Sequence, residues 1–185
     1  MDLGFRMHAE RTPNPNSIKW VLGQNLVEGG RAAHFDQAPG TELSPLAARL
    51  FAIDGVVGVF VAGNFVTVTK REDAEWAELA QPVVDAIKAF VAAGESALAA
   101  DYRPQIVGAE GEVASRIQEI IDREIRPAVA MDGGDIIFAG FEDGVVKVYL
   151  QGSCSGCPSS TATLKLGIET RLKEELPEVS EVVAL

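Results

Sequence analysis

The two cysteines of the chain are separated by two residues, in the sequence Cys154-Ser-Gly-Cys157, and a proline follows directly. Two thiols at this spacing can form a redox-active disulfide. They can also supply half of the four ligands that a tetrahedral zinc ion or an iron–sulfur cluster needs. The chain has no third cysteine. It therefore works either as a dithiol–disulfide couple or as one of two copies that pool their thiolates around one metal centre.

The cysteine pair is predicted to lie in a loop, residues 151–157, between a strand and a helix that begins at Pro158. Proline is well suited to the first position of a helix. The unpaired N–H groups and the positive dipole end of a helix N-terminus stabilise anions, so we expect the thiolate forms to be favoured there. Metal binding and redox exchange both need thiolates, so this expectation does not separate them.

Three uses of the pair compete. The motif of a disulfide oxidoreductase should follow a parallel strand of a βαβ unit, whereas this pair follows a predicted hairpin strand, which disfavours redox exchange. A zinc ion would need more ligands, and the two histidines, His8 and His34, lie in the other half of the chain, which leaves only a zinc shared between subunits. A [4Fe–4S] cluster needs four thiolates, which two chains related by a twofold axis can supply.

The composition is that of a globular protein, with 47% hydrophobic and 23% charged residues in 185 positions. The 27 acidic against 16 basic residues give a net charge of −11, which argues against binding to nucleic acid or to an anionic membrane surface. No segment approaches the roughly 20 apolar residues of a membrane span. The first residues lack the apolar core of a signal peptide and carry an acid, Asp2, so we expect a cytoplasmic protein.

Local signals predict a first domain over residues 1–94 and a linker over residues 95–110, where the apolar periodicity fades. Ser44, followed by proline, is a typical helix start. Residues 57–70 predict a hairpin across a Gly-Asn turn. Pro82 is predicted to open a new helix. This domain shows no chemistry of its own, so we expect it to contact partners or the other domain.

A second domain is predicted over residues 111–185. Its hydrophobic periodicity predicts a helix, two strands, a helix and a strand, at residues 113–125, 136–141, 145–150, 158–176 and 179–183. Pro127 is expected to end the first of these helices. The order α-β-β-α-β predicts helices on one face of a sheet, with the cysteine pair between a strand and a helix N-terminus. We therefore expect an α+β protein of two small domains.

Several sequence motifs, those around the cysteines among them, resemble those of a known family. Residues 154–169, together with Ile-Arg-Pro at 125–127 and Met-Asp-Gly-Gly-Asp at 131–135, resemble the NifU-like C-terminal domain of the Nfu iron–sulfur scaffold proteins. The first segment resembles the Nfu N-terminal domain at residues 12–17, 44–47, 50–56 and 66–70. The acidic residues of 131–135 could shape a cluster pocket, although a turn that enters a strand is the favoured interpretation.

The resemblance implies a scaffold that binds a [4Fe–4S] cluster between two subunits and hands it to apo iron–sulfur proteins. It implies Cys154 and Cys157 as the ligands from each chain, a homodimer on cluster binding, and upstream cluster-assembly proteins as further partners. Such a carrier is not an enzyme, and no nucleophile–base pair or phosphate loop in the sequence suggests catalysis. The alternative is a thiol–disulfide oxidoreductase in which one cysteine of the pair attacks and the other resolves.

Overall fold

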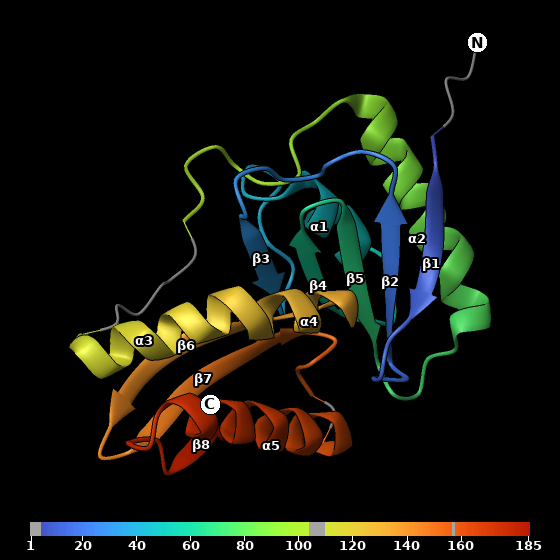
Figure 1. Cartoon of the computed structure of the whole chain (residues 1–185). Coiled ribbons are helices and arrows are strands. Elements are labelled where there is room, and N and C mark those ends of the chain that lie inside the picture. Colours follow the sequence, from blue (N-terminus) through green and yellow to red (C-terminus); the bar gives the residue numbers. More distant parts are fainter. Residues whose placement is uncertain (1–4, 104–109, 157) are drawn as a thin grey trace. The chain divides into compact units, whose positions relative to one another are not determined.

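The computed structural model describes residues 5–103, 110–156 and 158–185 (Figure 1). The chain divides into two compact units, Met1–Pro104 and Gln105–Leu185. Each unit combines helices and strands around a hydrophobic core of its own, which confirms the predicted α+β class.

The first unit is built on a five-stranded antiparallel sheet. Its strands are β1 (Met7–Arg11), β2 (Ser17–Leu22), β3 (Ala32–Phe35), β4 (Val56–Ala62) and β5 (Phe65–Lys70). In space they follow the order β1-β2-β5-β4-β3. The hairpin predicted over residues 57–70 is confirmed as β4 and β5. The sequence does not predict β3, because its four residues are too short a run for an alternating pattern to stand out.

Two helices, α1 (Pro45–Phe51) and α2 (Trp76–Ala93), cover one face of this sheet (Figure 1). The helix α1 begins as predicted, since the hydroxyl oxygen of Ser44 accepts the N–H of Ala47 at 3.2 Å. The predicted break at Pro82 is wrong, because α2 continues through this proline. A proline removes one N–H···O=C bond of the helix, and burial of the apolar stripe that follows it offsets this loss.

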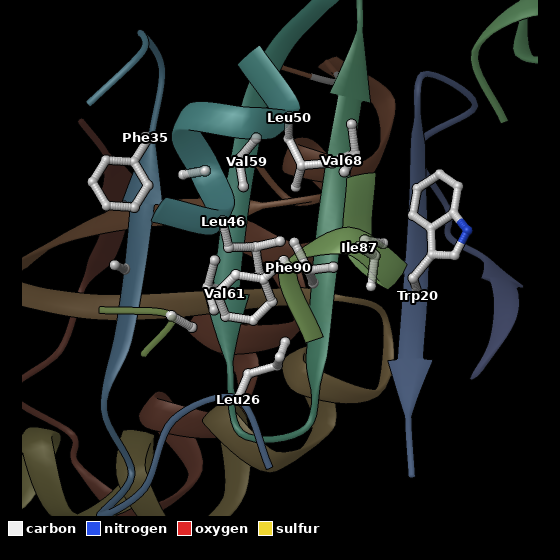
Figure 2. Packing of buried hydrophobic residues seen from close by; sticks show 14 of the residues in the cluster. Trp20, Leu26, Phe35, Leu46, Leu50, Val59, Val61, Val68, Ile87 and Phe90 are labelled. Carbon is white, nitrogen blue, oxygen red and sulfur yellow. The ribbon is translucent and has the colours of Figure 1, made fainter. Parts of the chain in front are cut away.

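The core of the first unit lies between the sheet and the two helices. Figure 2 shows Leu46 and Leu50 of α1 and Ile87 and Phe90 of α2 beside valines of β4 and β5. Residues 97 and 98 belong to the same core, each only 1% exposed. The first unit therefore extends beyond the predicted end at residue 94, where the alanine-rich sequence shows no periodicity.

The second unit is built on a three-stranded sheet. Its strands, in spatial order, are β6 (Gly134–Glu142), β7 (Val145–Gly152) and β8 (Glu181–Ala184). The pair β6–β7 is antiparallel, and β7–β8 is parallel. The helix α5 (Pro158–Glu175) connects β7 to β8. The predicted succession of two strands, a helix and a strand is present.

A helical run precedes this sheet in three consecutive segments. They are α3 (Glu112–Ile120), the π-helical turn η1 (Ile121–Ile125) and α4 (Arg126–Met131). The prediction that Pro127 ends the helix is wrong. Directly after the π turn, this proline stands in the first turn of α4, where its missing N–H costs least. The run continues one turn further than predicted and delivers the chain to the start of β6.

The core of the second unit uses one face of the sheet. It gathers residues of the helical run, the sheet and α5, among them Ile117, Ile121, Ile136, Phe138, Val146, Val148, Ile168 and Leu172. Cys154 belongs to the same cluster. Within residues 5–103, 110–156 and 158–185, no helix combines the length and apolar character that crossing a membrane requires.

Candidate metal centre

Cys154 lies two residues after the end of β7, in the loop that leads to α5. We call residues 153–156 the cysteine loop. The side chain of Cys154 is 7% exposed and packs in the core of the second unit. Cys157 lies outside the described residues, so the structure places one of the two predicted ligands.

The sulfur of Cys154 lies against Gly134, the first residue of β6. A Cβ atom added at Gly134 would stand 2.5 Å from this sulfur and 2.8 Å from the carbonyl oxygen of Gln151. Gly134 also lies opposite Gly152 in the β6–β7 register. The site therefore depends on a residue without a side chain at position 134, because any Cβ there would occupy the space of the sulfur.

Hydrogen bonds tie the cysteine loop to the connection between α4 and β6. We call residues 131–134, from the last residue of α4 to the first of β6, the diglycine turn. The N–H of Ser153 donates to the carbonyl oxygen of Gly133 at 3.2 Å. The hydroxyl of Ser153 donates to the carbonyl oxygen of Asp132. From α5, the hydroxyl of Thr161 donates to the carbonyl oxygen of Cys154 at 3.2 Å. The diglycine turn thus enters a strand, as predicted, and also supports the cysteine loop.

Burial raises the pKa of the Cys154 thiol to about 11. A contact with the hydroxyl of Ser153, 4.0 Å from the sulfur, opposes this rise in the pKa, and the negative charges of Asp132 and Asp135 add to it. The expectation that the helix N-terminus favours the thiolate is therefore wrong for Cys154. Burial disfavours the thiolate, and Cys154 lies four positions before Pro158, the first residue of α5, where the effect of the helix end has largely faded.

One sequence argument against redox exchange is also wrong. The strand β7 pairs with β6 on one side and is parallel to β8 on the other, so β7, α5 and β8 form a βαβ unit. The cysteine pair therefore does follow a parallel strand. A nucleophilic cysteine, however, needs a lowered pKa and access to its substrate. Cys154 has a raised pKa and a buried sulfur, so it is poorly suited to be the attacking thiol of a redox pair.

Histidine and carboxylate side chains are the other common ligands of metals in proteins. In the part that the structure describes, no three His, Cys, Asp or Glu side chains gather into a metal site. Both histidines belong to the first unit: His8 contacts Glu10 at 2.8 Å, and the ring of His34 lies 6.5 Å from that of Phe60.

Comparison with known proteins identifies both units. Residues 117–183 match the family described as the NifU-like domain, and residues 7–94 match the family described as the scaffold protein Nfu/NifU N terminal. The chain belongs to the Nfu family. This Nfu chain is 42% identical over 180 residues to the protein named NFU1 iron-sulfur cluster scaffold homolog, mitochondrial, of Drosophila erecta. It is 41% identical over 180 residues to the protein of the same name from Drosophila sechellia. Each alignment covers 95% of this chain and 63% of the relative.

Two solved structures also overlap this Nfu chain. The NifU-like protein from Saccharomyces cerevisiae aligns with a TM-score of 0.49 and 19% identity, covering 55% of this chain and 92% of that one. The protein SAV1430 from Staphylococcus aureus aligns with a TM-score of 0.41 and 22% identity, covering 44% of this chain and 98% of that one.

The expectation of a cytoplasmic protein is contradicted. The curated relatives carry the word mitochondrial in their names, which points to mitochondria rather than the cytoplasm. The Nfu chain spans about 63% of the length of these relatives, so the character of its first residues is no guide to the compartment.

The burial of Cys154 predicts that its thiol reacts slowly with reagents in solution. In the variant Cys157→Ser, where Cys154 is the sole thiol, we expect Ellman's reagent to react at least roughly tenfold more slowly with the folded chain than with the chain in denaturant. The reason is that Cys154 is only 7% exposed, so its sulfur must become accessible before it can react. Equal rates in both conditions would show that the cysteine loop is open in solution. The variant Cys154→Ser, with Cys157 as the sole thiol, provides the comparison.

Proposed function

We propose that two copies of this Nfu chain bind one [4Fe–4S] cluster between them and transfer it to apo iron–sulfur proteins. The observation that carries the proposal is the thiol count. The chain has two cysteines, three positions apart in the sequence, in a domain of the NifU-like family. A [4Fe–4S] cluster needs four thiolates, so two chains must contribute. A twofold axis through the cluster gives both chains the same ligand set.

Cys154 and Cys157 are the proposed ligands from each chain. Binding of iron at Cys154 must displace the thiol proton and replace the packing of the sulfur by coordination, because this thiol is buried and its pKa is raised. The free energy of the bond to iron is therefore reduced by the cost of deprotonating the thiol and of moving the sulfur out of its packed position. We infer that the cluster is held loosely enough for the thiolates of an acceptor to replace those of the Nfu chains one after another.

The role is that of a carrier with protein partners rather than that of an enzyme. The cluster is cargo, supplied by upstream cluster-assembly proteins and delivered to apo-acceptors. The net charge of −11 gives no support for a nucleic-acid partner. The first unit, of the Nfu N-terminal family, is proposed to contact partner proteins.

The proposal is tested by anaerobic reconstitution with iron and sulfide, followed by iron and acid-labile sulfide counts on protein resolved by size. We expect about four iron and four sulfide per dimer. The loaded dimer is then mixed with an apo dehydratase that needs a [4Fe–4S] cluster, and recovery of its activity is followed with a chelator present. A colourless protein with a titratable disulfide would favour the oxidoreductase instead. A loaded dimer that activates no acceptor would contradict the carrier role.

A further inference from the structure

Arg126 and Asp135 form a two-pronged ion pair close to the cysteine loop. Arg126 is the first residue of α4, and Asp135 is the second residue of β6. The guanidinium Nε donates to Oδ1 of Asp135 at 2.8 Å, and Nη2 donates to Oδ2 at 2.8 Å. The side chain of Asp135 is 9% exposed, and that of Arg126 is 37% exposed. The buried carboxylate of Asp135 is therefore paired with a guanidinium group, that of Arg126, which is partly exposed to solvent.

The pair brackets the structure that supports Cys154. The diglycine turn lies between the two residues along the chain, and Gly134, which contacts the sulfur, is the neighbour of Asp135. In the β6–β7 register, Asp135 lies opposite Gln151. Its buried carboxylate thus belongs to the residue next to Gly134, and Arg126 neutralises that carboxylate.

Neutralisation of the Asp135 carboxylate is important for cluster binding because the cluster is itself negatively charged. A [4Fe–4S] core with four thiolates carries a net negative charge, which an unpaired carboxylate beside it would repel. Loss of one partner from a buried ion pair also leaves the other charge uncompensated. We propose that Arg126 is a positioning residue for cluster binding, which cancels the charge that Asp135 would otherwise present to the cluster. This inference rests on the proposed function.

The test compares how fast a chelator removes the cluster from reconstituted full-length dimers. Arg126→Gln exposes the cluster to an uncompensated carboxylate, and we expect loss to be about tenfold faster than in the wild type. Arg126→Lys loses the two-pronged geometry but keeps the positive charge. Because the proposal concerns the charge, we expect its rate of loss to stay within about threefold of the wild type. Asp135→Asn removes the anion and is expected to lose the cluster no faster than the wild type. Equal acceleration in Arg126→Gln and Asp135→Asn would mean that the intact pair matters and the charge of Asp135 does not, and that result would overturn the proposal.

The double variant Arg126→Gln with Asp135→Asn completes the test and covers the case in which Arg126→Gln does not fold. It has no buried charge at this position, so we expect its rate of loss to match that of Asp135→Asn within about threefold. A loss much faster than in Asp135→Asn would show that Arg126 acts through something other than Asp135, which contradicts the proposal.

Arg123→Gln is the matched control. Arg123 lies in the same helical run and pairs with Glu124 at 2.6 Å, but its side chain is 51% exposed, and we expect no change in the rate. Arg126→Gln behaving like Arg123→Gln would also overturn the inference. A wild-type chain that takes up no iron would contradict the proposed function instead, so the two failures are distinguishable.

Discussion

Replacement of Cys154 by alanine is expected to reduce the iron content of the reconstituted protein from about four per dimer to nearly none. The chain has no other cysteine beyond Cys157 that could take over as a ligand. Each dimer would retain two thiolates of the four that a cluster needs. The effect is therefore all-or-none, unlike the graded effect expected at Arg126. Iron and acid-labile sulfide counts, with the visible absorption of the cluster, measure it.

Loss of the fold must be separated from loss of the ligand. Cys154 is buried, and its truncation leaves a small cavity that costs on the order of 1 kcal/mol, which a domain normally survives. Ser155→Ala is the matched control in the same loop. It removes the hydrogen bond from the Ser155 hydroxyl to the carbonyl oxygen of Gly152, 2.8 Å long, but no ligand, and it should bind a full cluster. A full cluster in a folded Cys154→Ala variant would rule out the ligand assignment.

Much of the fold follows from local signals in the sequence. Ser44 and the Gly-Asn turn of the β4–β5 hairpin act through contacts between near neighbours in the chain, so their effect is readable without the tertiary structure. The prolines show the limit of this approach. Pro82 and Pro127 both carry a strong local signal to break a helix, yet both lie inside helical runs. At Pro82, packing of the apolar stripe outweighs the local cost, and that packing is a tertiary property. Pro127 follows a π turn, which its own local sequence does not reveal.

In the candidate site, too, the sequence predicts some properties and not others. The type and spacing of the cysteines indicate the chemistry, because thiolates at this spacing have few uses. The state of Cys154 was not predictable, since its burial depends on Gly134, which is twenty positions away in the sequence and reaches the sulfur only through the β6–β7 pairing. Asp135 likewise meets its partner Arg126 across α4 and the diglycine turn. A parallel β7–β8 pair was hidden for the same reason, because it depends on where α5 returns the chain.

The second large effect is expected at Gly134. In Gly134→Ala, the new Cβ would stand 2.5 Å from the sulfur of Cys154 and 2.8 Å from the carbonyl oxygen of Gln151. The carbonyl belongs to the β6–β7 ladder, and the sulfur is held by a short side chain in the core, so neither can move away cheaply. We expect the second unit to lose about 1–3 kcal/mol of its free energy of unfolding, the usual cost of overpacking a core. We also expect weakened cluster binding, because the displaced sulfur is a proposed ligand.

Gly140→Ala is the control that isolates this contact. Gly140 lies in the same strand, and a Cβ there would meet nothing within 4 Å. Because alanine costs less backbone entropy than glycine in a strand, Gly140→Ala should be neutral or slightly stabilising.

Hydrogen exchange of the β6 and β7 amides in the full chain is the suitable measurement of these effects. Tryptophan fluorescence would not report on the second unit, because both tryptophans lie in the first unit. Exchange should be roughly fivefold to a hundredfold faster in Gly134→Ala and unchanged or slower in Gly140→Ala. Equal protection in the two variants would mean that the sulfur does not occupy this space in solution. A cluster bound normally by a destabilised Gly134→Ala chain would mean that coordination carries Cys154 away from Gly134.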